Sequence, residues 1–132
     1  MEKNTPTKDK ENFSLIARLR STNHAWRGLG IMFKTTHNAW VHLFFAVAVI
    51  VLGYILCISA TEWLFVVLAI GFVFVTEAIN TAIEIDIDLT SPEYHPYARD
   101  TKDVAAGAVL LATLFAAIVG LVIFLPKLAV LI

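Results

Sequence analysis

Three apolar segments dominate the sequence and restrict the chain to folds that can enter a bilayer. The first, residues 39–58, reads AWVHLFFAVAVIVLGYILCI, and its twenty residues would extend about 30 Å as a helix. The second segment is expected at residues 63–86 and the third at residues 104–125, where Pro126 is expected to end the helix. Of the 132 residues 58% are hydrophobic, well above the usual share in a soluble domain. The sequence therefore predicts an all-α membrane protein with three transmembrane helices.

A shorter segment of mixed character precedes the first span. Residues 13–34 combine apolar side chains with arginines, a pattern typical of an amphipathic helix that lies in the membrane surface. Trp26 would lie at the level of the lipid head groups, and Gly28 and Gly30 would weaken or bend the helix. The polar residues 1–12 are expected to form a disordered arm. We therefore expect a single membrane domain over residues 13–132.

The basic residues predict how the chain is oriented. Seven of the ten Lys and Arg residues precede residue 35, and Arg99 and Lys102 lie in the loop after the second span, whereas the short turn SATE has none. Cytoplasmic loops are enriched in basic residues, so the N-terminus and the long loop are expected in the cytoplasm and the C-terminus outside. Lys127, at the outer end, does not fit this pattern.

Small residues recur every four positions in the third span. They are Ala108, Ala112, Ala116 and Gly120. Such a ladder allows helices to approach closely, although alanine is also simply common in membrane helices. Three spans enclose little interior of their own, and we therefore expect the chain to associate with copies of itself.

Acidic and amide side chains line one face of the second span. Glu77, Asn80, Glu84 and Asp88 fall within an arc of roughly 80° on a helix, and Asp86 points to the opposite side. If Trp63 marks the outer interface, Glu77 lies about 21 Å into the membrane and Glu84 about 31 Å, near the inner head groups. A lipid hydroxyl could then approach Glu77 from the membrane, and a charged, water-soluble partner could approach Glu84 from the cytoplasm.

This gradient of depth suits two kinds of chemistry. A desolvated carboxylate has a raised proton affinity, as a general base requires. Carboxylate and amide oxygens bind Mg²⁺, which usually also bridges the phosphates of a substrate. The alternative is that these polar groups join helices to one another, with the acids paired to Arg or Lys of a neighbour.

The acidic face also resembles a known family signature. The stretch EAINTAIEIDID is similar to that of the prokaryotic diacylglycerol kinases, with Ile87 where the family more often has Val. The stretch HAWRGL and the segment SPEYHPYARDTKDVAAGAVLLA also resemble the family, and the likeness extends over residues 13–124. The matching residues are Glu77, Asn80, Thr81, Ala82, Ile83, Glu84, Asp88, Glu93, Tyr94, His95, Lys102 and Asp103.

The resemblance implies a fold and a reaction. The fold would be a surface helix with three spans, assembled as a homotrimer with composite active sites in a bacterial inner membrane. The reaction would be transfer of the γ-phosphoryl group of ATP to a lipid hydroxyl at the cytoplasmic face. Forms with SPEYHP and KDVAAGAVLL are typical of family members that include undecaprenol kinases, which favours undecaprenol slightly over diacylglycerol as the substrate.

The resemblance also implies roles for individual residues. Glu77 would take the proton of the hydroxyl, and Asn80 would help bind the lipid. Glu84 would hold the Mg²⁺ that accompanies ATP. Lys102 and Asp103 would contact the nucleotide, although Asp103 could instead cap the third span. Asp88 would help bind the nucleotide or pair with a cation such as Arg99.

One position departs from the family pattern. Relatives often carry an acidic residue after the surface helix that supplies a second carboxylate to the metal. Aligned without gaps, that position is Thr36, and no acid lies between Glu11 and Glu62. Either Thr36 with Asn38 or His37 supplies weaker ligands, or water takes the place of the carboxylate.

Two other functional classes compete with a lipid kinase. A small proton-coupled exporter also uses a membrane-embedded glutamate, but generally in the first of four spans. A non-catalytic membrane scaffold would have no need of four polar side chains on one arc.

Overall fold

The computed structural model describes residues 15–130, and their side chains from Arg20 onward. This part of the chain forms four helices and no strand: α1 (Leu15–Thr35), α2 (His37–Ile55), α3 (Ala60–Thr90) and α4 (Pro96–Ala129). The last three helices are long and apolar enough to cross a membrane. The all-α fold with three membrane-spanning helices is thereby confirmed. The predicted arm, residues 1–12, lies outside the described residues.

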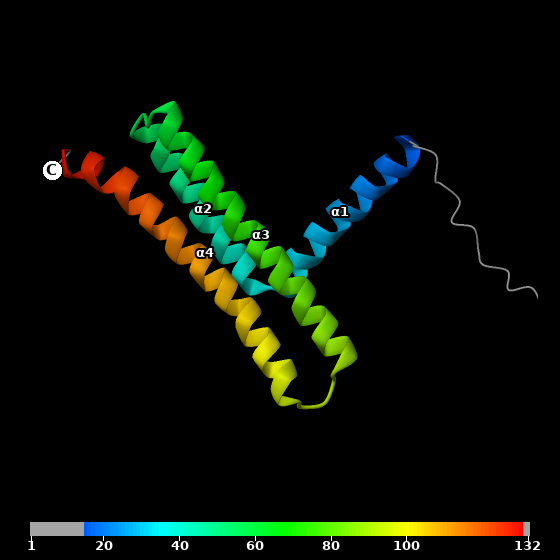
Figure 1. Cartoon of the computed structure of the whole chain (residues 1–132). Coiled ribbons are helices and arrows are strands. Elements are labelled where there is room, and N and C mark those ends of the chain that lie inside the picture. Colours follow the sequence, from blue (N-terminus) through cyan, green and yellow to red (C-terminus); the bar gives the residue numbers. More distant parts are fainter. Residues whose placement is uncertain (1–14, 131–132) are drawn as a thin grey trace, which may run out of the picture.

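Helix α3 is the centre of the arrangement. It contacts each of the other three helices, and α4 runs antiparallel beside it over most of its length (Figure 1). The lower ends of α3 and α4 extend past the corner where α1 meets α2 (Figure 1). With 31 and 34 residues, these helices are about 46 and 51 Å long, more than the ~30 Å hydrocarbon core requires. The α3–α4 hairpin is therefore long enough to extend beyond the hydrocarbon core.

Helix α1 leaves the bundle sideways from the start of α2 (Figure 1). Residues 20–30 are all exposed, including Trp26, and only the last turn packs inward, where Met32 is buried. This is the arrangement expected of a helix lying in the membrane surface. Gly28 and Gly30 were predicted to weaken or bend the helix, but α1 is continuous through both. A glycine lowers helix stability by only about 1 kcal/mol, which an otherwise helical segment tolerates.

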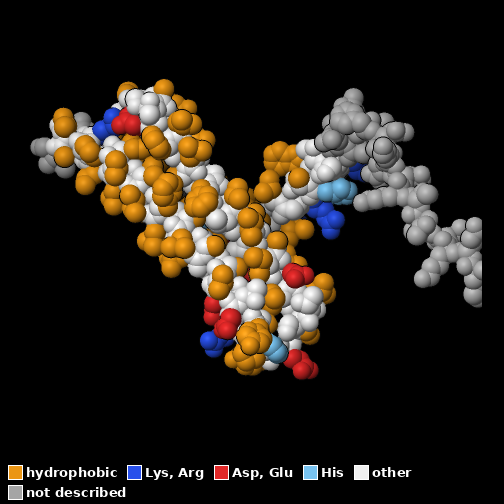
Figure 2. All heavy atoms as spheres, viewed as in Figure 1, with side chains coloured by type: hydrophobic (Ala, Val, Ile, Leu, Met, Phe, Trp, Pro, Cys, Tyr) orange, Lys and Arg blue, Asp and Glu red, His pale blue; other side chains and the backbone are white. Residues whose placement is uncertain are grey.

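The opposite end of the bundle is closed by apolar packing and one ion pair. Ile58, Val66, Ile123 and Phe124 form a buried cluster from the α2–α3 turn, α3 and α4. Next to it, Lys127 Nζ lies 3.1 Å from Glu62 Oε1. Figure 2 shows hydrophobic side chains over the bundle between this pair and the charged tip of the α3–α4 hairpin. The lysine that did not fit the charge pattern is therefore balanced by a neighbouring carboxylate.

The helix ends differ from the predicted spans. Span one was predicted at 39–58, span two at 63–86 and span three at 104–125, whereas the helices run His37–Ile55, Ala60–Thr90 and Pro96–Ala129. Pro126 does not end α4, because a proline removes only one backbone hydrogen bond and the Lys127–Glu62 pair holds the final turn to α3. The longer ends of α3 and α4 follow from polar residues that continue the helices outside the apolar windows.

Part of the small-residue ladder is used within the chain. Ala112 is completely buried, Ala116 and Gly120 are half-buried, and Ala108 is exposed. Ala112 and Ala116 therefore support the packing of α4 within the single chain.

Candidate functional site

The corner between α1 and α2 sets the depth of the site. Thr36 has an extended backbone conformation that separates the two helices, and its hydroxyl donates to the carbonyl of Met32 at 2.7 Å. The same hydroxyl lies 3.1 Å from Thr81 Oγ1 of α3. The indole of Trp40 braces the corner by donating to the carbonyl of Phe33 at 2.8 Å. The N-terminal end of α2 is thus level with Thr81.

Glu77 lies one turn deeper in the bundle than this corner. The four residues between it and Thr81 correspond to about 6 Å of helix rise. Its side chain has no exposed surface, and neither carboxylate oxygen has a hydrogen-bond partner among the described residues. The nearest charged-capable group is His42 of α2, whose Nε2 lies 3.7 Å from Oε2. The open approach from the lipid that the sequence suggested is therefore closed in the single chain.

Side-chain direction explains why His42 and Glu77 meet. Counting residues from the turn between α2 and α3 would place His42 level with Val73, one turn away from Glu77. Side chains on a helix point toward its N-terminus, so the carboxylate of Glu77 reaches back toward Val73. The imidazole of the antiparallel α2 leans in the opposite direction, toward Glu77. The two groups close the gap of one turn from both sides.

Asn80 links the buried part of this face to its exposed part. Its Nδ2 donates to Glu84 Oε1 at 3.0 Å. Its Oδ1 is buried and has no hydrogen-bond partner among the described residues. Burial decreases along the arc, from fully buried Glu77 and nearly buried Asn80 through half-buried Glu84 to exposed Asp88. The side chains of the arc thus follow a gradient from the bundle interior to its surface.

Three ion pairs lie at the tip of the α3–α4 hairpin, and one of them connects the two helices. Lys102 Nζ lies 2.9 Å from Asp88 Oδ1, so Lys102 and not Arg99 is the partner of Asp88. Arg99 instead lies 3.6 Å from Asp103 and 3.8 Å from Asp100. The Lys102–Asp88 pair joins the end of α3 to α4, whereas the contacts of Arg99 lie within α4.

Asp103 is not the N-cap of the third span. Helix α4 begins two turns earlier with Pro96, and His95 is its cap, accepting a hydrogen bond from the backbone N–H of Tyr97 at 3.3 Å. Proline is well suited to a first helical position because its missing N–H would be unpaired there in any case. Asp103 is therefore an exposed residue on the side of α4, and its carboxylate is available to a ligand or to Arg99.

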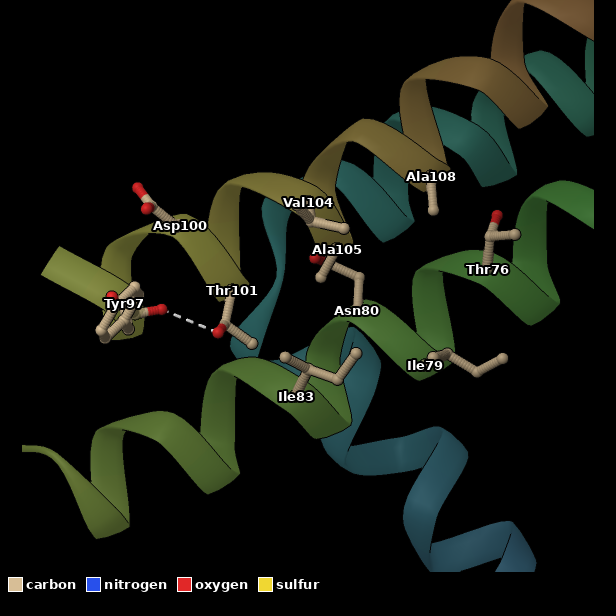
Figure 3. Close-up of a pocket in the computed structure, with 10 residues that line it drawn as sticks. All are labelled: Thr76, Ile79, Asn80, Ile83, Tyr97, Asp100, Thr101, Val104, Ala105 and Ala108. Atoms are coloured by element: carbon tan, nitrogen blue, oxygen red, sulfur yellow. Dashed lines mark hydrogen bonds between the residues drawn. The ribbon is translucent and has the colours of Figure 1, made fainter.

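Two cavities flank the buried carboxylate. A groove of about 500 Å³ runs between α3 and α4, and Figure 3 shows Asn80 directed from α3 toward Ala105 of α4. A second cavity of about 310 Å³ lies among α2, α3 and α4, with His42 and Val73 on its wall. Among the described residues, the linings of both cavities include neighbours of Glu77 but not Glu77 itself. A rotation of its side chain would be needed to reach either one.

The oxygen donors present fit magnesium only in part. No group of three or more His, Cys, Asp or Glu side chains converges as a metal site within residues 15–130. The carboxylate of Glu84 and the unpartnered Oδ1 of Asn80 are hard oxygen ligands of the kind that Mg²⁺ takes. Two such donors leave most of the coordination to phosphate oxygens and water, as is common for this ion.

Sequence reasoning missed His42 as a partner of Glu77 and Thr36 as a partner of Thr81. A signal for the first existed, because His42 is the one side chain of residues 39–58 that can carry a charge near neutral pH. A simple count of helix rise, without the direction of side chains, would have misplaced it by a turn. Thr36 was singled out only for lacking a carboxylate, and its contact with Thr81 depends on how α1 and α2 bend at the corner.

Comparison with known proteins identifies the chain's relatives. A sequence profile described as prokaryotic diacylglycerol kinase matches residues 23–124. The undecaprenol kinase of Bacillus subtilis is 41% identical over 122 residues, which cover 92% of this chain and 98% of the relative. The diacylglycerol kinase of Synechocystis sp. is 41% identical over 111 residues, which cover 83% of this chain and 63% of the relative. The diacylglycerol kinase of Escherichia coli is 27% identical over 107 residues, which cover 76% of this chain and 82% of the relative. The profile spans most of the chain and carries the residues of the acidic face, and the chain therefore belongs to the prokaryotic diacylglycerol kinase family.

Proposed function

We propose that this lipid kinase transfers the γ-phosphoryl group of ATP to the hydroxyl of a membrane lipid at the cytoplasmic face of a bacterial inner membrane. Membership of the family makes it a lipid kinase and sets aside the exporter and the scaffold. The location of the site is supported mainly by two carboxylates on α3. Glu77 lies one turn inside the corner of α1 and α2, and Glu84 lies about one turn outside it.

Glu77 is proposed as the general base. It would accept the proton of the lipid hydroxyl as that oxygen bonds to the γ-phosphorus, while the bond from the γ-phosphorus to the bridging oxygen breaks and ADP leaves. A buried carboxylate with unused hydrogen-bonding capacity suits this role, since its oxygens are free to receive a substrate proton. Asn80, directed into the α3–α4 groove, would help bind the lipid alcohol.

The groove between α3 and α4 is the proposed approach for the lipid. The lining of the groove is mostly apolar at the end near Thr76 and Ala108. Polar side chains become more frequent at the other end, near Asp100 and Thr101 (Figure 3). A lipid alcohol has the same polarity, with an apolar tail and a polar end. The lipid hydroxyl would be brought from this groove past Asn80 to Glu77.

The nucleotide is proposed to bind at the tip of the hairpin. A cavity of about 320 Å³ there is lined by Asp88, Lys102 and Asp103. The ammonium of Lys102 would exchange part of its contact with Asp88 for phosphate oxygens. Glu84 would hold the Mg²⁺ that binds with ATP, and that ion would neutralise negative charge on the phosphates. Phosphoryl transfer needs mainly positioning and charge neutralisation, so this small set of residues is sufficient.

The lipid is proposed to be undecaprenol in preference to diacylglycerol. The support is the relative from Bacillus subtilis, an undecaprenol kinase that matches almost the entire length of both chains. The diacylglycerol kinase from Synechocystis has the same identity over a smaller share of its own length. We further propose a homotrimer, as the resemblance to the family implies, and the exposed Ala108 on the small-residue face of α4 would allow a second copy to approach closely.

The decisive experiment offers both lipids to the wild-type protein and to Glu77→Gln. The purified chain in mixed micelles with labelled ATP and Mg²⁺ should phosphorylate undecaprenol faster than diacylglycerol. Glu77→Gln keeps the shape of the side chain but cannot take the proton, so turnover should fall about a hundredfold or more. Glu77→Gln protein that assembles normally and turns over like wild type would remove Glu77 as the base. A wild-type preference for diacylglycerol would reverse the proposed substrate and leave the base in place.

A further inference from the structure

Two ionisable side chains from different helices face each other inside the bundle, and only Glu77 has a proposed role so far. His42 Nε2 and Glu77 Oε2 are 3.7 Å apart, with side-chain exposures of 14% and 0%. Neither atom has a hydrogen-bond partner among the described residues. Burying polar groups without partners is unfavourable by about 1–3 kcal/mol for each group. Because this burial is unfavourable, we expect the contact between His42 and Glu77 to serve the function of the protein.

The other groups around Glu77 are already engaged or cannot donate a hydrogen bond. On α3 itself, the amide nitrogen of Asn80 is bonded to Glu84. At the α1–α2 corner, the hydroxyl of Thr36 is bonded to Met32. On α4, the residues that line the groove beside this level, Ala105 and Ala108, are apolar. The hydroxyls of Thr81 and Thr113 donate to backbone carbonyls of their own helices. His42 Nε2, which lies 3.7 Å from the carboxylate, has no other hydrogen-bond partner among the described residues and is therefore the donor best placed to meet it.

On the proposed role of Glu77 as base, we infer that His42 is a positioning residue for the phosphoryl transfer. Its Nε2–H donates to one carboxylate oxygen of Glu77 and fixes the plane of the carboxylate. The second oxygen is then directed at the lipid hydroxyl. His42 touches neither the lipid nor the phosphate, and it keeps its own proton throughout the reaction. Its effect is to orient the base and to stabilise the carboxylate as an anion inside an apolar bundle.

The distance of 3.7 Å is longer than a hydrogen bond, and the surroundings of His42 allow it to shorten. The cavity of about 310 Å³ among α2, α3 and α4 borders His42, so the imidazole has room to rotate. Catalytic hydrogen bonds are often long in the absence of substrate and tighten in the reactive complex. Binding of the lipid would draw Glu77 and His42 together as the site closes.

The test compares an apolar replacement with one that keeps the donor. His42→Phe has a ring of similar size without N–H groups, and His42→Gln carries an amide N–H at a similar reach. We expect His42→Phe to lower kcat about tenfold or more while KM for ATP changes less than about twofold, because only the base is disturbed. His42→Gln should retain at least about a third of the wild-type kcat. His24→Phe, on the exposed part of α1, is the matched control and should behave like wild type.

Thermal stability separates orientation from folding. Replacing an unpartnered buried group with an apolar ring should leave the thermal midpoint unchanged or raise it, although kcat falls. If His42→Phe does not fold, His42→Leu provides the same comparison with a smaller side chain. A kcat for the apolar variant within twofold of wild type would overturn the inference, as would a His42→Gln enzyme no more active than His42→Phe. Glu77→Gln tells the two proposals apart: an inactive Glu77→Gln with a fully active His42→Phe refutes only the role of His42, whereas an active Glu77→Gln refutes the base itself.

Discussion

Glu84 and Asp86 stand two residues apart on α3 and have opposite surroundings. Glu84 is half-buried and accepts a hydrogen bond from Asn80, whereas Asp86 is exposed and its carbonyl, not its carboxylate, is the atom that binds Thr90. Only the first carboxylate faces the proposed site. The pair therefore separates the effect of the helical face from that of negative charge in general.

Replacing each of these two acids by its amide should have different effects on the metal requirement. Glu84→Gln removes a charged oxygen ligand, and the Mg²⁺ concentration for half-maximal rate should rise about tenfold. Asp86→Asn should leave that concentration within about twofold of wild type. The measurement is initial rate against Mg²⁺ at fixed ATP. Equal shifts in both variants would show that the face on α3 does not define the metal site.

Thr36 is the position at which the resemblance to the family, aligned without gaps, implies a second carboxylate in relatives. Its contact with Thr81 directs it toward α3, one turn from Glu84. Adding an acid there, as Thr36→Glu, should lower the Mg²⁺ concentration for half-maximal rate by about threefold or more, because added ligand charge raises metal affinity in oxygen-ligand sites. The substitution gives up the hydrogen bond to Met32, so turnover need not increase.

Thr35→Glu is the matched control for this charge. Thr35 is exposed and its hydroxyl donates to the carbonyl of Ile31 within α1, away from α3. The same metal titration should be unchanged in Thr35→Glu. A Thr36→Glu protein that is folded and titrates like its control would mean that Thr36 does not face Glu84 during catalysis.

At the scale of the helices, the turn between α2 and α3 is closely packed. A Cβ atom on Gly53 would lie 2.9 Å from Trp63 Cη2 and 3.1 Å from Ile58 Cδ1. The glycine lets Trp63 lie against α2, where its ring also contacts Tyr54 with ring centroids 4.9 Å apart. Cys57, the turn residue, has a φ of 47°, a left-handed conformation that reverses the chain in few residues.

A larger side chain at Gly53 should therefore loosen this end of the bundle. Gly53→Val is expected to reduce the free energy of unfolding by about 1–3 kcal/mol, as overpacking does in closely packed interiors. Gly71→Val is the control, because nothing lies within 4 Å of a Cβ at that helical position. Thermal unfolding in detergent measures both. A midpoint for Gly53→Val as high as that of Gly71→Val would contradict the close packing of Trp63.

Local sequence signals located some helix ends and were overlooked at others. The turn SATE contains a capping box: Ser59 accepts from the N–H of Glu62, whose carboxylate accepts from the N–H of Ser59. That pattern would have placed the start of α3 at Ala60 instead of Trp63. In the same way, Pro96 after His95 marks the start of α4 more directly than the apolar run that begins at Val104.

At the scale of the whole molecule, the three spans followed from apolar length alone, because a bilayer requires about twenty such residues for each helix. The acidic arc followed from helical periodicity, and its decreasing burial agrees with the expected gradient. The enclosure of Glu77 could not be predicted, because it depends on how α2 and α4 pack around α3. The same holds for the pairing of Lys127 with Glu62, which joins residues 65 positions apart.

The depth of Glu77 has a consequence for how a reaction at this site would end. In the proposed placement, the carboxylate of Glu77 lies one turn deeper than the head-group plane. It would therefore contact a substrate oxygen that enters the apolar layer, as the hydroxyl of an otherwise apolar lipid does. Once phosphorylated, the same oxygen belongs to a strongly hydrated dianion, which is far more stable in water than at that depth. The phosphorylated lipid would therefore move outward to the head-group plane. Hydration of its phosphate would be sufficient to drive its release from the site. Phospholipids, whose phosphates already lie in that plane, would be excluded for the same reason.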